Sequence, residues 1–164
     1  MSPGADGGTV VRRWSPADLD ACLGVVAGLP DFFTPDVAGQ VATDLGQHRG
    51  WVIANAGRVV GFAVVAARGR RGAEILWAAV DGSRRGQGLG TRLLDRVLDD
   101  LAADGVRVVL AKTLDGSAGY PPYQATRAFW EGRGFVQVDT IDPLPGWQPG
   151  NPSAIYVAAL GPTR

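Results

Sequence analysis

The feature that most constrains the fold is RRGQGLG (84–90), a glycine-rich, cationic turn between two segments of opposite character. The segment before it, AEILWAAV (73–80), is a continuous apolar run that predicts a buried strand. After the turn, apolar residues recur at helical spacing and predict an amphipathic helix that ends at Gly105. This apolar stripe comprises Leu89, Leu93, Leu94, Val97, Leu98 and Leu101. The chain is therefore expected to combine helices with a sheet.

The turn is suited to bind an anion. The first N–H groups of a helix lack intrahelical acceptors and carry the positive end of the helix dipole. Glycines there leave room for a phosphate and tolerate a positive φ, and Arg84 and Arg85 add positive charge. A simple connector with solvated arginines is the alternative interpretation. The turn is not a P-loop, which needs a Gly-Lys pair, and Thr91 stands where a dinucleotide-binding motif has its third glycine.

Composition narrows the class of protein. A chain of 164 residues suffices for one domain with a sizeable core. Sixteen basic and sixteen acidic residues give a formal net charge of zero, which argues against a nucleic-acid partner. A single cysteine, Cys22, excludes an internal disulfide, and we expect it to be buried. The start, MSPGADGG, lacks signal-peptide features and no long apolar stretch occurs, so we expect a cytoplasmic protein without a membrane partner.

The remaining patterns predict the other elements. Strands are expected at 9–14, in a hairpin over 51–67 that turns at 55–57, and at 106–114, 135–140 and 153–160. Helices are expected from the cap Ser15 to about Leu29, from the cap Thr34 to about Gln47, and over 123–134. We expect a mixed sheet with helices on both faces to bury these segments. The loop 68–72 is expected to be solvated, and the long loops 115–122 and 142–152 are typical of functional loops.

Two motifs together indicate a family. The first motif has the form (Arg/Gln)-x-x-Gly-x-(Gly/Ala), where x is any residue, and it is filled by Arg85, Gly88 and Gly90. The second motif is TRAFWEGRGF (126–135), a predicted short helix followed by Gly-Phe. With these motifs the chain resembles the GNAT superfamily of acyl-CoA N-acyltransferases over about residues 10–160, most closely its small bacterial members of unassigned acceptor. The resemblance implies one GNAT-like α/β domain over 1–164, with 1–8 flexible. Its mixed sheet would be mostly antiparallel, with about seven strands, helices on both faces and a splayed pair of parallel strands.

The resemblance also implies that acetyl-CoA is the cofactor. Backbone groups of Ala78, Ala79 and Val80 would bind its pantetheine arm, and the N–H near Ala78 would polarise the thioester carbonyl. Trp130 and Tyr123 of the later helix would contact the same cofactor. The turn would hold the pyrophosphate, with the arginines near the phosphates, and comprises Arg84, Arg85, Gly86, Gln87, Gly88, Leu89, Gly90 and Thr91.

Glu74 is the residue that we expect to accept a proton. It is the only charged residue in the strand 73–80. It also matches the general-base glutamate of the histone-acetyltransferase branch of the superfamily, in an alignment that needs no gap between this residue and the glycine-rich turn. An alkyl amine has a pKa of about 10.4 and is mostly protonated at neutral pH, so a carboxylate that accepts its proton assists attack. The alternative is a charged residue at the exposed start of a strand.

This sequence departs from the family pattern at the position of the general acid. Trp130 stands where many GNAT enzymes have a tyrosine, and an indole cannot supply a proton near neutral pH. Tyr120 and Tyr123 are substitutes in principle, although a loop packed against the sheet explains them equally well. A thiol with a pKa of about 8.5 is a fair leaving group, so catalysis without a side-chain acid stays open.

The acceptor pocket would contain Glu74 together with aromatic and polar residues of two loops, Phe32, Phe33, Trp147 and Asn151. These suit an acceptor with an apolar part, although core packing explains them equally well. The resemblance implies transfer of acetyl to a small-molecule primary amine. A protein or peptide acceptor, an inactive module that binds CoA or a partner, and a homodimer stay open. No metal is expected, because His, Cys and carboxylates lack ligand spacing, and His48 is expected at the surface or at a helix end.

Overall fold

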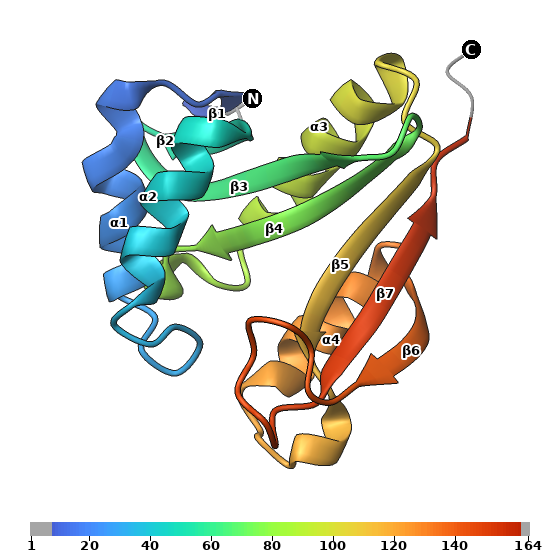
Figure 1. Cartoon of the computed structure of the whole chain (residues 1–164). Helices are drawn as coiled ribbons and strands as arrows, with labels where there is room; N and C mark the ends of the chain where they lie inside the picture. The colour runs from blue at the N-terminus through green and yellow to red at the C-terminus, as the bar shows by residue number, and fades with distance from the viewer. Residues whose placement is uncertain (1–7, 162–164) are drawn as a thin grey trace. The chain divides into compact units, whose positions relative to one another are not determined.

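The computed structural model describes residues 8–161, and its elements follow the predicted order (Figure 1). The strands are β1 (Thr9–Arg13), β2 (Arg49–Asn55), β3 (Arg58–Arg68), β4 (Gly72–Val80), β5 (Val108–Leu114), β6 (Val136–Ile141) and β7 (Ser153–Ala159). The α-helices are α1 (Leu19–Ala27), α2 (Val37–Gln47), α3 (Leu89–Ala103) and α4 (Tyr123–Gly132). Short 3-10 turns are η1 (Pro16–Asp18), η2 (Gly82–Arg84) and η3 (Gly116–Ala118). The flexibility expected for 1–8 concerns mainly residues 1–7, which lie outside the described residues.

The strands form one seven-stranded sheet in the order β1-β2-β3-β4-β5-β7-β6. The pairs β1–β2, β2–β3, β5–β7 and β6–β7 are antiparallel, whereas β4 and β5 are parallel. The parallel register runs from Gly72 opposite Val108 to Ile75 opposite Ala111. Parallel neighbours need a crossover, and the segment that contains α3 supplies it. The predicted mixed, mostly antiparallel sheet with one parallel pair is confirmed.

The chain forms two compact units, and both β3 and β4 contribute residues to each. The first unit comprises residues up to Ala66 together with Trp77–Asp100. The second comprises Ala67–Leu76 and the residues from Leu101 onward. The turn 84–90 therefore belongs to the first unit, and Glu74 belongs to the second.

In the first unit, helices cover both faces of the sheet. Gly50 of β2 faces α2 so closely that a Cβ there would lie 3.0 Å from Leu45 Cδ2. The next residue, Trp51, donates from Nε1 to Asp100 Oδ2 of α3 at 2.8 Å. Because successive side chains of a strand point to opposite faces, α2 and α3 lie on opposite faces of the sheet, as predicted. Cys22 is fully buried in α1, and burial raises the pKa of its thiol to about 12.

In the second unit, three buried aromatic side chains belong to the core. Trp130 of α4 contacts Phe135 with ring centroids 5.0 Å apart, and both side chains are buried. Tyr156 of β7 is fully buried and donates its hydroxyl to Glu131 Oε1 at 2.9 Å. Burial, followed by this hydrogen bond, raises the pKa of Tyr156 to about 12. The Tyr156–Glu131 hydrogen bond joins β7, the strand between β5 and β6, to α4.

Two helix starts differ in detail from the prediction. The capping box between Ser15 and Asp18 forms, but it opens the 3-10 turn η1 rather than the α-helix. Thr34 donates its hydroxyl to the Asp36 carboxylate, and α2 begins only after Asp36, at Val37. The hairpin turn is as predicted, since Ala56 and Gly57 have φ values of +50° and +79°. No helix among the described residues has the length and apolar character needed to cross a membrane.

Candidate active site

The end of β4 is held in place by the 3-10 turn that comes after it. Asp81 donates its N–H to the carbonyl of Val60 in β3 at 2.7 Å. Its carboxylate accepts the N–H of Ser83 at 3.0 Å and the Ser83 hydroxyl at 2.9 Å. These two hydrogen bonds, the backbone one first, lower the pKa of Asp81. The strand therefore enters the glycine-rich turn from a defined position.

The glycine-rich turn has the backbone that a phosphate site requires. Gly86 and Gly88 have φ values of +78° and +74°, a conformation that glycine adopts without steric cost. A Cβ at either position would meet no atom within 4 Å, so open space lies beside both. The first helical hydrogen bond runs from the Arg92 N–H to the Gly88 carbonyl at 3.1 Å. The preceding N–H groups of α3 therefore have no acceptor within the helix, an arrangement typical of helix starts that bind anions.

The two arginines of the turn are anchored by different neighbours. Arg84 Nη1 donates to Asn55 Oδ1 of the hairpin turn at 3.3 Å. The Arg85 guanidinium lies 4.5 Å from the centre of the Phe32 ring, a cation–π contact. Phe33 contacts Trp77 of β4, with ring centroids 6.1 Å apart. The structure thus brings the loop that carries two predicted acceptor residues to the predicted cofactor turn and to β4.

The backbone direction of β4 agrees with the predicted cofactor contacts. The Asp81 N–H bonds β3, and a Cβ added to Gly61 of β3 would lie 2.9 Å from the Ala79 carbonyl oxygen. Backbone polar groups of a strand alternate in direction, so those of Ala78 and Val80 point away from β3. Ala78 is also exposed. The predicted contact with the pantetheine arm therefore rests on Ala78 and Val80 rather than on Ala79.

Glu74 is buried, in contrast to the alternative of an exposed strand start. The residue is 6% exposed, and each carboxylate oxygen has a cationic partner. Arg68 Nε lies 2.9 Å from Oε2, and Lys112 Nζ lies 3.0 Å from Oε1. The Arg68 side chain is 49% exposed, as expected for a solvated loop, and the ion pair with Glu74 is an addition that the sequence did not predict. Such pairing is what a buried carboxylate requires, and all three groups belong to the second unit.

The aromatic residues of the α4 region divide into a surface pair and a core residue. Tyr120 is 40% exposed and its ring centroid lies 6.0 Å from that of Tyr123. Burial raises the pKa of Tyr123. Trp130 is 6% exposed and packs edge-on against Phe135. Trp130 is therefore a packing residue, and its predicted contact with the cofactor stays a prediction.

The predicted acceptor residues fall in both units. Phe32 and Phe33 lie in the first unit, whereas Trp147 and Asn151 lie in the loop between β6 and β7 of the second. In that loop the Trp147 N–H donates to the Leu144 carbonyl at 2.9 Å. Trp147 is half-buried and Asn151 is exposed. Each pair lies in a loop of its own unit, and the predicted role of these residues in acceptor binding stays a prediction.

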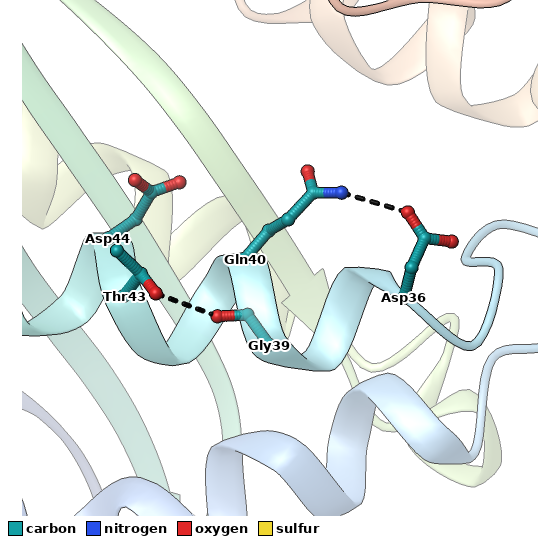
Figure 2. Close-up of a pocket in the computed structure, with 5 residues that line it drawn as sticks. All are labelled: Asp36, Gly39, Gln40, Thr43 and Asp44. Carbon is teal, nitrogen blue, oxygen red and sulfur yellow. Dashed lines mark hydrogen bonds between the residues drawn. The ribbon is translucent and has the colours of Figure 1, made fainter.

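A shallow pocket on α2 contains none of the predicted residues (Figure 2). It is lined by Asp36, Gly39, Gln40, Thr43 and Asp44. Figure 2 shows Gln40 reaching along the helix to Asp36, to which its Nε2 donates at 2.9 Å. Asp44 accepts a hydrogen bond from Trp77 Nε1 at 2.7 Å, so this pocket adjoins the tryptophan that contacts Phe33. His48, at the end of α2, is half-buried, as expected.

The partners of Glu74 and of Trp77 have no signal in the sequence pattern. Arg68 stands close to other arginines, and Asp44 is one of several acidic residues in the predicted helices. Lys112 is distinguished as the only lysine, but nothing in the pattern connects it with Glu74. Among the described residues, no group of three or more His, Cys, Asp or Glu side chains could hold a metal ion.

Comparison with known proteins agrees with these features. A GNAT-family acetyltransferase from Desulfovibrio desulfuricans superposes with a TM-score of 0.81 at 23% identity, over 93% of this chain and 99% of its own. The ribosomal-protein-S18-alanine N-acetyltransferase from Escherichia coli gives 0.76 at 19%, over 95% and 96%. An aminoglycoside 6'-N-acetyltransferase complexed with coenzyme A gives 0.74 at 17%, over 94% and 99%. At these identities the likeness shows the fold.

The sequence comparison identifies the family. No curated protein matches the chain. The model of the acetyltransferase (GNAT) family matches residues 24–135, which include β4, the glycine-rich turn, α3 and α4. Because this match spans more than half of the chain, the protein belongs to the acetyltransferase (GNAT) family.

Proposed function

We propose that this acyltransferase moves an acetyl group from acetyl-CoA directly to the primary amine of a small molecule, with Glu74 as general base. GNAT enzymes use acetyl-CoA and act on amine acceptors, so family membership supports both the donor and the class of acceptor. The observation that carries the proposal is the turn before α3. Its two left-handed glycines border open space at a helix N-terminus.

The residues that would hold the donor lie on consecutive segments of the first unit. The pyrophosphate would bind the backbone N–H groups of the turn, where Arg85, held over Phe32, adds positive charge. The outward backbone groups of Ala78 and Val80 would bind the pantetheine arm. When bound, acetyl-CoA supplies an activated thioester. The N–H near Ala78 would then stabilise the developing oxyanion, a contribution of about 10²–10³ in rate.

Glu74 would receive the proton of the acceptor amine. A carboxylate offers about four acceptor positions, and the two cationic partners occupy two of them. An amine, or a water that relays its proton, can use a remaining position. The burial of Glu74 supports this role, because general-base groups act best where bulk water does not compete.

The departure of CoA would need no side-chain acid. Trp130 lies in the aromatic core and cannot donate a proton. Burial raises the pKa of Tyr123, which makes its hydroxyl a weaker acid than an ordinary tyrosine. A thiolate whose conjugate acid has a pKa of about 8.5 leaves without this assistance.

The acceptor would combine a positive charge with an apolar part. The rings of Phe33 and Trp77 offer an apolar surface, and the adjoining pocket on α2 carries Asp36 and Asp44. The fold itself does not select the acceptor. It is shared with an aminoglycoside acetyltransferase and with an enzyme named for the alanine of a ribosomal protein.

The test is an acceptor screen with acetyl-CoA, read as release of free thiol. The panel contains small primary amines with and without aromatic groups, and peptides with a free α-amine. Turnover of small amines, fastest for those with an apolar group, is expected. Turnover of peptides alone would replace the small-molecule acceptor with a peptide. Calorimetric binding of CoA without turnover of any amine would favour an inactive CoA-binding module.

A further inference from the structure

We infer that Phe32 is a positioning residue for the phosphate end of the donor, because its ring holds the Arg85 guanidinium ready to bind the pyrophosphate of acetyl-CoA. This role rests on the proposed function, in which the glycine-rich turn binds that pyrophosphate. The family resemblance placed Phe32 in the acceptor pocket, so the role moves this residue from the acceptor to the donor. Both residues belong to the first unit.

The loop after α1 is fastened to the segment that leads into the turn. The N–H groups of Phe32 and Phe33 both donate to the Leu29 carbonyl, at 3.0 Å and 3.1 Å. Leu29 is buried, and a Cβ added to Gly82 would lie 3.4 Å from Leu29 Cδ2. The Leu29 side chain therefore packs against the start of η2. This packing holds the loop that carries the Phe32 ring beside the segment that carries Arg85.

The Phe32 ring holds Arg85 without using its hydrogen-bond donors. The guanidinium carbon lies 4.5 Å from the ring centroid. A cation–π contact acts between the positive charge and the negative face of the ring, so the N–H groups can still donate to phosphate oxygens. Arg84 is held differently, since its Nη1 donates to Asn55 Oδ1 at 3.3 Å. The contact with Phe32 therefore leaves the planar donor fork of Arg85 available for a phosphate.

Holding this side chain in advance matters because Arg85 is exposed. A free arginine side chain populates many rotamers and loses this freedom when it binds a phosphate. A guanidinium that already lies over a ring has lost part of that freedom before the donor arrives, so donor binding costs less entropy. An exposed cation–π contact of this kind should contribute about two- to fivefold to the affinity for CoA.

The neighbouring ring of the same loop has a different partner. Phe33 packs edge-on against Trp77 of β4 with ring centroids 6.1 Å apart, and the Trp77 indole donates to Asp44 of α2 at 2.7 Å. Phe32 thus contacts the turn, whereas Phe33 contacts β4. The same substitution at these two adjacent positions therefore separates an effect on the donor from a general disturbance of the loop.

The experiment measures the affinity for CoA by calorimetry. Phe32→Leu should weaken CoA binding about two- to fivefold, because leucine is apolar but has no ring, and Phe32→Tyr, which keeps the ring, should retain the wild-type affinity. The matched control Phe33→Leu should leave the affinity unchanged. Arg85→Gln should weaken binding by about tenfold or more. Adding Phe32→Leu to Arg85→Gln should then have no further effect, because the guanidinium that the ring holds is absent.

Three results would overturn the role of Phe32 and leave the proposed function intact. The first is wild-type affinity in Phe32→Leu, and the second is an equal loss of affinity in Phe33→Leu. The third is an undiminished effect of Phe32→Leu in the Arg85→Gln background, since the ring would then act without the guanidinium.

Amine turnover with acetyl-CoA, assayed on the same samples, separates these results from a failure of the proposed function. Coupled effects of Phe32 and Arg85 on CoA binding, without turnover of any amine, would support the role of Phe32 and overturn the transfer reaction alone. Absence of CoA binding to the wild type would overturn both.

Discussion

The two crossovers that leave the parallel strands begin alike and then diverge. β4 and β5 are each followed by Asp-Gly-Ser, at 81–83 and 115–117. In both, the aspartate carboxylate accepts a hydrogen bond from the serine N–H at 3.0 Å. It also accepts a hydrogen bond from the serine hydroxyl, at 2.9 Å in the first turn and 2.6 Å in the second. The same three residues therefore form the same 3-10 turn in both units. The local turn depends on these residues alone.

The residues after the shared turn decide the chemistry of each crossover. The first continues into two left-handed glycines, Gly86 and Gly88, and presents the N–H groups of α3 beside open space. The second continues into Tyr120 and two prolines, and Pro122 stands at the N-cap of α4. Proline has no N–H, so this second helix start offers fewer backbone donors. The first helix start therefore presents more backbone donors to an anion such as the proposed pyrophosphate than the second does.

The largest effect is expected from Glu74→Gln, a substitution in β4, the strand that comes before the first crossover. Glutamine keeps the size of the side chain and can still accept hydrogen bonds, but it cannot take up a proton from the amine. We expect kcat to fall by about 10²–10⁴-fold, with acetyl-CoA affinity little changed. Steady-state kinetics and calorimetry measure both quantities. Full activity in this variant would make Glu74 a structural residue.

The next effect separates the two crossovers directly. Gly88 and Gly119 both have positive φ, at +74° and +64°, and a Cβ at either would meet no atom within 4 Å. Valine at either position carries a similar backbone strain, on the order of 1–2 kcal/mol. Only Gly88→Val should place a side chain at the proposed pyrophosphate site, so it should weaken acetyl-CoA binding by well over tenfold. Equal affinities of the two variants by calorimetry would remove the phosphate assignment.

A smaller effect is expected at the helix of the second crossover. Trp130→Tyr keeps an aromatic ring in the core and restores the hydroxyl that many GNAT enzymes have there. If CoA leaves without a side-chain acid, kcat should change by less than about tenfold. A gain of a hundredfold or more at unchanged acetyl-CoA affinity would instead show that wild type lacks an acid it needs. Trp130→Ala, which empties a buried site, should cost about 3–5 kcal/mol of stability.

The smallest effect concerns the shared turns and depends on pH. The Ser117 hydroxyl, the Ser117 N–H and Gln137 lower the pKa of Asp115 from 3.8 to about 2. A depressed folded pKa stabilises the native state above pH 3.8, and this contribution is lost as the pH falls through 2. Asp115→Asn should therefore lower Tm at neutral pH, and the difference from wild type should narrow between pH 4 and 2. Asp115 also accepts a hydrogen bond from Gln137 of β6, whereas both hydrogen bonds described above for the Asp81 carboxylate come from Ser83. Asp81→Asn should therefore lower Tm less than Asp115→Asn in the same thermal melts.

Much of the fold could be predicted because its signals are local. The amphipathic stripe of α3 depends on spacing along one helix, and the turns at Gly57 and Gly88 depend on residues that tolerate a positive φ. The resemblance to the GNAT superfamily then predicted acetyl-CoA as the donor and the order of the strands along the chain. Errors arose at helix starts, where Thr34 bonds Asp36 and the helix begins later than the cap-plus-proline pattern predicts.

By itself, then, the sequence determined the order of elements, the glycine-rich turn and the family. The tertiary structure alone decided the surroundings of the candidate catalytic group. Arg68 reaches Glu74 across the β3–β4 turn, and Lys112 reaches it through the parallel register of β4 and β5. Likewise Phe32 contacts Arg85 although the two residues are 53 positions apart in the sequence. Such contacts depend on strand pairing and packing between distant segments, which side-chain spacing along one chain does not encode.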